Sequence, residues 1–523
     1  MRRVWVAALV LAAGCASAPI KKADMVELAT ADAKVHEGCY DCLLAARNTY
    51  ARIAVGKARP LVIGRLFETE LLIAVREKAL ALPSDETIAR ARSLVPDLPP
   101  GYSADRLFAL VDAILPYDIG TPNSELIQLR RPRAAYVRTI DGEIAWLASS
   151  PLTPVVSQSL TLAIDCAYPF RTPPAGQPRR PPGWRPQAPP DAPPLIRFGV
   201  ANCGNPIFAD LEKLRADVPS FIDAAVFLLR LGLVTARDDG GRNVKERFTE
   251  VYARFSNSPA VTYLGGNYYQ IIGDCREGLR YYDETIALKP VHERALLGRT
   301  ICLTYLKRQQ DAIAAATRMI ELKTFNVSEA YYWRAWNHHF LKDLPQARRD
   351  IESAKAIAAS GEIFTLAGII EHDQDDLAVA EKDLKSARQA AYGNRNCTAA
   401  WYLGLVGMKR QQWLESSDWF LGAMTCYEQN VAESETGLAQ MQAKTDLDPD
   451  FKARQIANFE AALKEDRGQF HAAAFNAANQ GARGGDFARA KTLIEVAAKD
   501  PALADLVKQL RTFLAGKDSA RRP

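Results

Sequence analysis

The chain has 523 residues, of which 48% are hydrophobic and 24% are charged, with a formal net charge of +5. A charge balance this close to neutral gives no electrostatic reason to expect nucleic acid or an acidic membrane surface as a partner. The apolar fraction is sufficient for a folded core, and the length exceeds one ordinary domain unless the domain is built from stacked repeats.

The N-terminal residues 1–14 predict a signal peptide. Two arginines precede the apolar run Val4–Ala13, which is too short for a permanent membrane-spanning helix. The ending Leu-Ala-Ala-Gly-Cys resembles the lipobox of bacterial lipoproteins, with Ala12 where Leu is usual. This resemblance implies that Cys15 is lipidated, that residues 15–22 are an anchor and tether, and that the protein faces the periplasm. Ala16 rather than Asp follows the cysteine, which in enterobacterial lipoproteins favours the outer membrane. An ordinary secretory signal is the alternative.

Residues 23–165 predict a helical domain with degenerate repeats. The stretch Gly38–Ala45 has the character of a turn followed by a second helix. Apolar residues then recur at helical spacing, and Ser84 is a candidate N-cap. The expected helices are Pro60–Leu82, Ser84–Val95, Ser103–Leu115, Arg133–Leu147 and Thr153–Ala167.

A proline-rich loop follows at residues 166–203. Its density of proline excludes a helix or a central strand and predicts an extended, solvated segment. It is either a passive insertion or an exposed basic strip in which Trp184 anchors a partner.

Residues 204–430 contain an internal repeat. Small residues recur at steps of 34, 35, 33 and 36 residues. A second small residue stands about twelve positions earlier in each copy, and packing residues stand four and seven positions later. The first set is Gly278, Ala312, Ala347, Ala380 and Ser416; the earlier set is Gly266, Thr300, Ala335, Gly368 and Gly404; the packing residues are Tyr282, Ala316, Ile351, Leu384 and Phe420, then Thr285, Met319, Ala354, Ala387 and Ala423.

This pattern resembles the tetratricopeptide repeat (TPR), a helix-turn-helix of 34 residues. The resemblance implies an all-α fold, a TPR-type α-solenoid of stacked helical hairpins, with a less regular helical domain before it. It also implies a concave groove lined by first helices, through residues that the packing pattern does not use. The matching positions are Tyr263, Asn267, Gln270, Arg294, Ile301, Tyr305, Glu329, Tyr332, Trp336, His339, Phe340, His372, Trp401 and Leu405.

Residues 431–515 predict C-terminal repeats and a capping helix. A stretched hairpin is expected from Val431–Lys444 and Asp450–Glu465, then one more repeat over Gln469–Lys499. Pro501–Leu514 should cover the last hydrophobic face of the solenoid. Residues 516–523 form a frayed tail.

Eight cysteines remain besides Cys15, an even number in a compartment that should be oxidising. In the TPR register, the two members of each pair in the solenoid lie toward one end of the hairpins. Disulfides are therefore expected for Cys275–Cys302, Cys397–Cys426, Cys166–Cys203 and Cys39–Cys42. Because Cys39 and Cys42 begin a helix, a redox-active pair is an alternative to a structural disulfide.

Chemical motifs are sparse, with no phosphate-binding glycine loop, no zinc-protease HExxH and no GxSxG elbow. We expect no catalytic residues, no metal and no cofactor. His339 and His372 occupy equivalent places in successive repeats, with Asp373 as the only acidic neighbour, and two solvent-facing histidines are expected rather than a metal site.

Three classes of function remain. The favoured class is an outer-membrane-anchored periplasmic scaffold that binds a protein or peptide in its groove during envelope assembly. The second is a periplasmic small-ligand-binding lipoprotein associated with a transporter. The third is a thiol oxidoreductase that uses Cys39 and Cys42.

Overall fold

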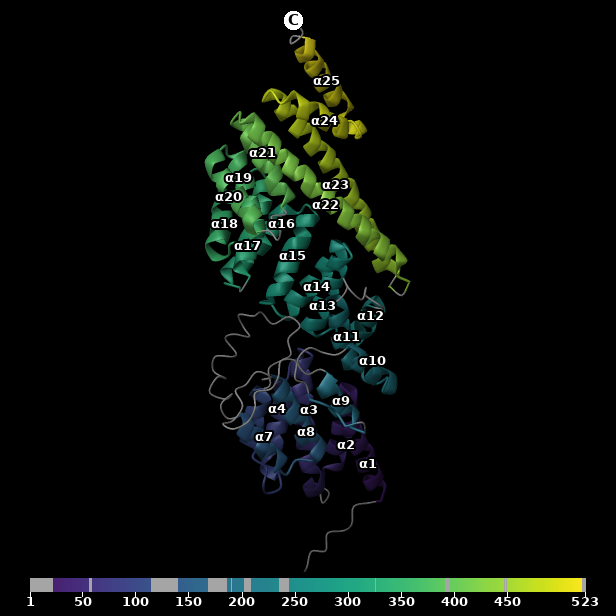
Figure 1. Cartoon of the computed structure of the whole chain (residues 1–523). Coiled ribbons are helices and arrows are strands. Elements are labelled where there is room, and N and C mark those ends of the chain that lie inside the picture. Colours follow the sequence, from purple (N-terminus) through teal and green to yellow (C-terminus); the bar gives the residue numbers. More distant parts are fainter. Residues whose placement is uncertain are drawn as a thin grey trace, which may run out of the picture. The chain divides into compact units, whose positions relative to one another are not determined.

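The computed structural model describes residues 22–55, 59–113, 140–167, 186–189, 191–201, 208–234, 244–324, 326–390, 396–445, 447 and 449–519. These residues form helices, turns and no strand (Figure 1). They divide into two compact units, with described residues through Leu228 in the first and those from Leu229 onward in the second. The predicted lipidation site Cys15 and most of the predicted proline-rich loop lie outside the described residues. None of the described helices has the length and apolarity needed to cross a membrane.

The first unit is built around a helix that is buried on most sides. Its helices are α1 (Lys22–Glu37), α2 (Tyr40–Ile53), α3 (Arg59–Ala79), α4 (Asp85–Leu94), α5 (Ala104–Ala113), α7 (Ile140–Ala148), α8 (Pro154–Ala167), α9 (Pro194–Ala201), α10 (Phe208–Asp217) and most of α11 (Ile222–Val234). Helix α3 packs against α2, α4, α5 and α8. Ser84 precedes α4 as predicted, but its side chain makes no capping hydrogen bond.

Helix α3 carries charged residues into the core of this unit. Glu68, Glu70, Arg76 and Glu77 are each at most 6% exposed. Arg76 Nε lies 3.3 Å from the fully buried Asp223, and its NH2 group donates to the Gly38 carbonyl at 3.1 Å. Buried charges need such partners because removal from water is costly. The core of the first unit is therefore held by polar contacts as well as by apolar packing.

The second unit is a stack of helical hairpins. A leading helix α12 (Val244–Phe255) precedes them. The hairpins are α13 (Pro259–Ile271) with α14 (Cys275–Leu288), α15 (Glu293–Tyr305) with α16 (Gln309–Glu321), α17 (Val327–Phe340) with α18 (Leu344–Ile357), α19 (Gly361–Asp373) with α20 (Leu377–Ala390), and α21 (Cys397–Lys409) with α22 (Trp413–Ala443). Each helix packs against its predecessor and its successor.

The predicted packing register holds in every one of these hairpins. All of the residues that the repeat pattern assigns to packing are buried. A Cβ added at Gly368 would meet Leu384 Cγ at 2.5 Å, and one added at Gly404 would meet the Phe420 ring at 2.8 Å. The small residue of the first helix therefore accommodates the large residue of the second. The second unit is a TPR-type α-solenoid.

The hairpin turns share one backbone conformation. The turn residue has a positive φ in each hairpin, and the element that follows begins two residues later. A positive φ is unusual for a residue with a side chain, so the tight turn is imposed by the packing of the two helices. The residues are Gly273, Lys307, Lys342, Asp375 and Gln411.

The last hairpin differs from the sequence prediction. The stretched hairpin was expected as separate helices, but α22 runs unbroken to Ala443 and α23 (Pro449–Arg483) is equally continuous. No proline lies inside either helix after its first position, and Gly422 and Gly468 are tolerated within them. The two helices pack along each other as a long antiparallel hairpin, whose closed end holds Ala443 and Pro449.

The closed end of this long hairpin returns to the first repeat. Lys245 of α12 and Asp450 of α23 form an ion pair of 2.5 Å, and Arg454 packs beside the turn at Gly273. Helices α24 (Phe487–Ala497) and α25 (Ala504–Ser519) finish the unit at the other end of α23. Ala490, Ile494 and Ala497 of the repeat predicted over Gln469–Lys499 are buried, and α25 covers the final hydrophobic face.

The division between the units lies later than the sequence suggested. The solenoid was predicted to start at residue 204, directly after the proline-rich loop. Instead α9 packs against α1, α8 and α10, and these helices belong to the first unit. Gly38 shows why: Leu195 of α9 approaches so closely that a Cβ there would clash at 2.4 Å. The change in composition at the loop therefore does not mark a boundary between compact units.

Candidate functional site

A hollow of about 370 Å³ lies between the first helices α15 and α17 of adjacent hairpins. We call it the aromatic hollow. Its lining is Thr304, Tyr305, Lys307, Gln309, Tyr332, Trp333, Trp336, Asn337 and Phe340. The repeat register places these residues together, because first helices of successive hairpins are neighbours in the stack.

The aromatic side chains of the hollow contact one another and remain accessible. Tyr332 lies against both Trp333 and Trp336, with ring centroids 5.3 Å and 6.4 Å away, and Tyr305 lies against Trp333 at 6.3 Å. Trp336, Phe340 and Tyr305 are 37%, 57% and 67% exposed. Burial raises the pKa of Tyr332 to about 12, so its hydroxyl stays protonated. Large rigid side chains held in this way bind a partner with little loss of conformational entropy.

One buried polar side chain also lines the hollow. The Nδ2 group of Asn337 donates to Thr304 Oγ1 at 2.8 Å and to the Trp333 carbonyl at 2.7 Å. Its Oδ1 is buried and has no hydrogen-bond partner among the described residues. A buried acceptor without a donor is energetically unfavourable. The walls of the hollow are mostly apolar and aromatic, the composition typical of binding pockets.

The two groove histidines are bridged by a carboxylate. His339 Nε2 lies 2.9 Å from Asp373 Oδ2, and His372 Nδ1 lies 3.1 Å from Asp373 Oδ1. Their side chains are only 19% and 11% exposed, so the expectation of two solvent-facing histidines was wrong. Burial lowers the pKa of His372. For Asp373, burial alone would raise the pKa, but the two histidines outweigh it and hold that pKa below its usual range.

The remaining predicted groove residues fall into two groups. Arg294 and Glu329 are exposed on the first-helix side of the solenoid, and Ile301 is half-buried. Tyr263, Asn267 and Gln270 are partly buried in the first hairpin, where Gln270 accepts from the Tyr282 hydroxyl at 2.6 Å. Tyr263 packs against the rings of Tyr282 and His292. These residues line no part of the aromatic hollow.

The predicted position of Trp401 in an open groove was wrong. Trp401 stacks edge-on against Phe420 with centroids 5.3 Å apart and packs on the buried Ala473 of α23. Leu405 packs on the same core. The reason is the long helix α23, whose residues Ala473 and Ala474 belong to the core clusters on which Trp401 packs.

Trp333 and Asn337 are the residues that sequence reasoning missed. Trp333 was not among the predicted groove positions. The signal for Asn337 was available, because the equivalent positions in the other hairpins are Tyr268, Cys302, Ile370 and Val406, all buried. In the other hairpins this position belongs to the core. An asparagine there costs free energy, because its polar amide is removed from water.

The cysteines are arranged as follows. The structure joins Cys39 to Cys42 and Cys397 to Cys426 by disulfides. The expected Cys275–Cys302 bridge is absent: both are buried free thiols in mutual hydrogen-bonding contact, where Cys302 lowers the pKa of the Cys275 thiol. The two cysteine side chains lie in a tightly packed core next to Gly278. This core keeps them adjacent without a covalent bond. Cys203, the expected partner of Cys166, lies outside the described residues.

No family model and no curated protein sequence matches this chain. Solved structures that are similar include a TPR protein from Parabacteroides merdae (11% identity, covering 52% of this chain and 92% of that one, TM-score 0.36). PilF of Pseudomonas aeruginosa has 12% identity, covers 40% and 94%, and has a TM-score of 0.35. YrrB, described as a TPR protein with an unusual peptide-binding site, has 12% identity, covers 34% and 91%, and has a TM-score of 0.29.

These likenesses are too partial to carry an argument, so the assignment rests on the packing register itself. Five hairpins in phase bury the same small and large residues at the same positions, and each turns through a residue with positive φ. We conclude that this chain is an all-α protein containing tetratricopeptide-type repeats.

Proposed function

We propose that this protein is an envelope-anchored interaction scaffold that binds an extended segment of a protein partner at the aromatic hollow. The observation that carries the proposal is the gathering of exposed aromatic side chains, Tyr305, Trp336 and Phe340, around one hollow. An apolar side chain of the partner would occupy the hollow against these rings. Contacts of this kind supply most of the affinity of a binding surface.

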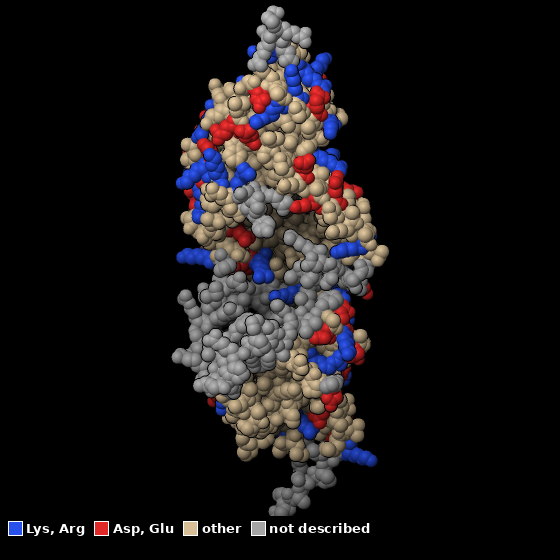
Figure 2. Space-filling view, in the orientation of Figure 1, with Lys and Arg blue, Asp and Glu red and all other residues tan. Residues whose placement is uncertain are grey.

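The charge of the surface is consistent with a partner of mixed composition. Lysine and arginine are interspersed with aspartate and glutamate over the described surface seen in Figure 2, without a field of one sign. A strongly charged partner would therefore gain little from long-range attraction. Recognition should depend on shape and apolar contact at the hollow.

Trp336→Ala tests the site. The partner is first isolated by affinity capture from envelope extracts and then titrated against purified variants. Truncation of Trp336 should weaken binding by at least about tenfold, as expected for a central aromatic contact. Its midpoint of thermal unfolding should change little, because Trp336 is 37% exposed.

Phe513→Ala is the matched control. Phe513 is 44% exposed on α25, outside the hollow, so its truncation should leave binding unchanged. Equal binding by wild type and Trp336→Ala would contradict the proposal, as would equal losses in Trp336→Ala and Phe513→Ala.

The anchor is a separate part of the proposal. The lipobox resemblance implies attachment through Cys15 to the outer membrane, facing the periplasm, where several acyl chains hold a protein stably. Cys15→Ser should release the protein into the soluble periplasmic fraction. A variant that still fractionates with the membrane would contradict a lipid anchor as the sole attachment. The oxidising periplasm would also maintain the Cys39–Cys42 and Cys397–Cys426 disulfides, which mass mapping of non-reduced peptides would detect.

A small-ligand binder is the second candidate function. The volume of the hollow, about 370 Å³, lies within the range of small-molecule sites. Binding of a small periplasmic solute that competes with the protein partner for Trp336 would favour it. The thiol oxidoreductase is disfavoured, because Cys39 and Cys42 are 1% and 3% exposed and exchange requires an attacking thiolate to reach a sulfur.

A further inference from the structure

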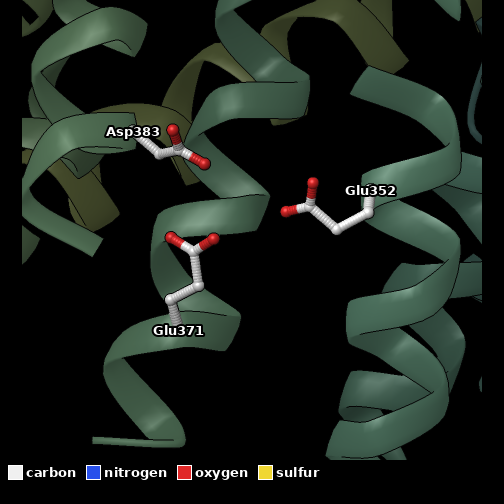
Figure 3. Close-up of side chains that lie close together, drawn as sticks. All are labelled: Glu352, Glu371 and Asp383. Carbon is white, nitrogen blue, oxygen red and sulfur yellow. The ribbon is translucent and has the colours of Figure 1, made fainter. Parts of the chain in front are cut away.

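Three carboxylates converge between α18, α19 and α20. Glu352, Glu371 and Asp383 each come from a different helix and direct their carboxylates toward one another (Figure 3). One oxygen from each lies within 4.8 Å of the other two. Oxygens bound to one Ca²⁺ lie at about 2.3–2.6 Å from the ion, so they are at most about 5 Å apart. The spacing is therefore compatible with three ligands to a single cation.

The repeat register explains why these acids converge. Glu352 follows the packing residue Ile351, Glu371 follows the buried Ile370, and Asp383 precedes the packing residue Leu384. Each acid is thereby held beside the hairpin core by its apolar neighbour. The convergence is built by the backbone of three packed helices.

In other hairpins, the positions equivalent to Glu371 and Asp383 hold compatible side chains. Glu371 and Asp383 stand twelve residues apart and face each other across their hairpin. Two of the equivalent pairs are Tyr269–Tyr281, whose rings stack at 5.4 Å, and His338–Asp350, whose Nε2 and Oδ2 atoms lie 3.8 Å apart. In this comparison, Glu371 and Asp383 form the pair that places like charges together.

Glu371 is the side chain that the fold leaves unsatisfied. It is 0% exposed, and neither of its carboxylate oxygens has a hydrogen-bond partner within the part of the chain that the structure describes. Burial, and then the charge of Asp383, raise its pKa to about 8. A buried carboxyl without hydrogen bonds is costly in either protonation state. Its oxygens face the other two carboxylates, where a bound cation would satisfy them.

Lys355 is the cation present at the cluster. Its Nζ donates to Glu352 Oε1 at 3.0 Å and to Asp383 Oδ2, but it stays 4.0 Å from Glu371 Oε1. One ammonium therefore faces three carboxylates. The other nearby cation, Arg348, bonds Asp376 and Gln374. A lysine on a flexible stem can turn toward solvent, and the Glu352 side chain, 49% exposed, opens the cluster on that side.

We propose that Glu352, Glu371 and Asp383 form a binding site for a hard divalent cation of the Ca²⁺ or Mg²⁺ class, with Lys355 as the internal competitor that the cation displaces. Carboxylate oxygens are the ligands these ions prefer. The cation would join α18, α19 and α20 across two successive hairpins, adding a link that stiffens the middle of the solenoid.

The test uses the full chain stripped of metal with a chelator. Calorimetric titration with Ca²⁺ and Mg²⁺ separately, at pH 8 and up to about 5 mM, covers the range of weak extracellular sites. Wild type should bind one cation with a raised midpoint of thermal unfolding. Lys355→Met should bind at least about tenfold more tightly, because the competing charge is gone.

Two further variants separate a cation site from a general effect of salt. Glu371→Gln should lose the cation-induced shift, while remaining folded because a neutral amide suits the buried position. Glu381→Gln, on α20 but paired with Lys385 and Arg410, should bind the cation as wild type does. The proposal is overturned if neither wild type nor Lys355→Met binds either ion at about 5 mM. It is equally overturned if Glu371→Gln binds as well as wild type, or if Glu381→Gln loses binding.

Discussion

The two units of this chain fill their interiors with different kinds of side chain. In the second unit, each hairpin buries apolar residues at fixed intervals, with small residues where helices approach most closely. In the first unit, the central helix α3 carries four charged residues into the interior, where polar groups from elsewhere in the unit contact them. Periodic packing can therefore be recognised from the amino-acid sequence, because its residues recur at fixed intervals. A polar core cannot be recognised in this way, because its partners lie far apart in the sequence. Each of the following predictions tests that contrast.

The largest effect is expected in the polar core. Arg76→Met would leave Asp223, which is 0% exposed, without its counter-ion. Removing one partner of a buried pair costs about 3–5 kcal/mol. Denaturant unfolding of the variant measures the loss. The double variant Arg76→Met, Asp223→Leu should recover most of the stability, and a loss below about 1 kcal/mol in the single variant would show that this ion pair is dispensable.

The apolar core of the solenoid should respond to volume instead. Gly368→Ala places a Cβ 2.5 Å from Leu384 Cγ and 3.2 Å from the Ala380 carbonyl oxygen. Overpacking of this kind costs about 1–3 kcal/mol. Gly422→Ala is the control, because nothing lies within 4 Å of its Cβ position in the middle of α22. That variant should gain about 0.5–1 kcal/mol of stability from helix propensity. The midpoint of thermal unfolding of each variant measures the effect. Equal changes in the two midpoints would contradict the packing register.

A buried histidine should make the solenoid sensitive to acid. His292 Nδ1 accepts from the Ala295 amide at 3.1 Å and caps α15, and burial lowers its pKa to about 3. The folded pKa lies below the unfolded value of about 6.5, so the stability it contributes is present above pH 6.5 and is lost as the pH falls toward 3. The loss should be on the order of 2 kcal/mol at pH 5.

His292→Asn isolates this effect. Asparagine can accept the same capping hydrogen bond and does not titrate. The free energies of unfolding of wild type and variant, measured at pH 7.5 and at pH 5, should diverge in favour of the variant at the lower pH. Identical pH dependence in the two proteins would contradict the assignment of His292 as a neutral buried cap.

The smallest effect is expected for the ion pair at the closed end of the long hairpin. Lys245 and Asp450 have side chains 50% and 63% exposed, and such pairs contribute about 0–1 kcal/mol. Lys245→Ala should therefore change the free energy of unfolding by less than about 1 kcal/mol. If Lys245→Ala lowered the free energy of unfolding as much as Arg76→Met, the difference in burial would not explain how much each ion pair contributes to stability.

Much of the fold could be predicted because the relevant information is local. The spacing of Gly368 to Ala380, and of Ala380 to Leu384, fixes which faces of two adjacent helices meet. The helix predicted over Ser84–Val95 is found as α4, Asp85–Leu94, directly after Ser84. The continuity of α22 and α23 was missed, because a polar surface segment without proline gives no sign of whether a helix continues or stops.

The candidate site was predicted only in part. Tyr305, Tyr332, Trp336 and Phe340 line the aromatic hollow, as their positions on first helices suggested. Trp401 occupies an equivalent place in its repeat and is nevertheless packed in a core, because α23 covers it. Helical periodicity indicates which side of a helix a residue occupies. It does not indicate what lies opposite that side.

By itself, the sequence determined the all-α class, the phase of the five hairpins and the identity of their packing residues, since these follow from interactions between segments that are adjacent in the chain. Only the tertiary structure decided which first-helix residues stay accessible, which cysteines meet as thiols, and how Glu352, Glu371 and Asp383 converge. Those outcomes depend on distances between separate helices. A helical repeat specifies the neighbours of each residue within its hairpin, while contacts with a long returning helix or across successive hairpins arise from the curvature of the whole stack.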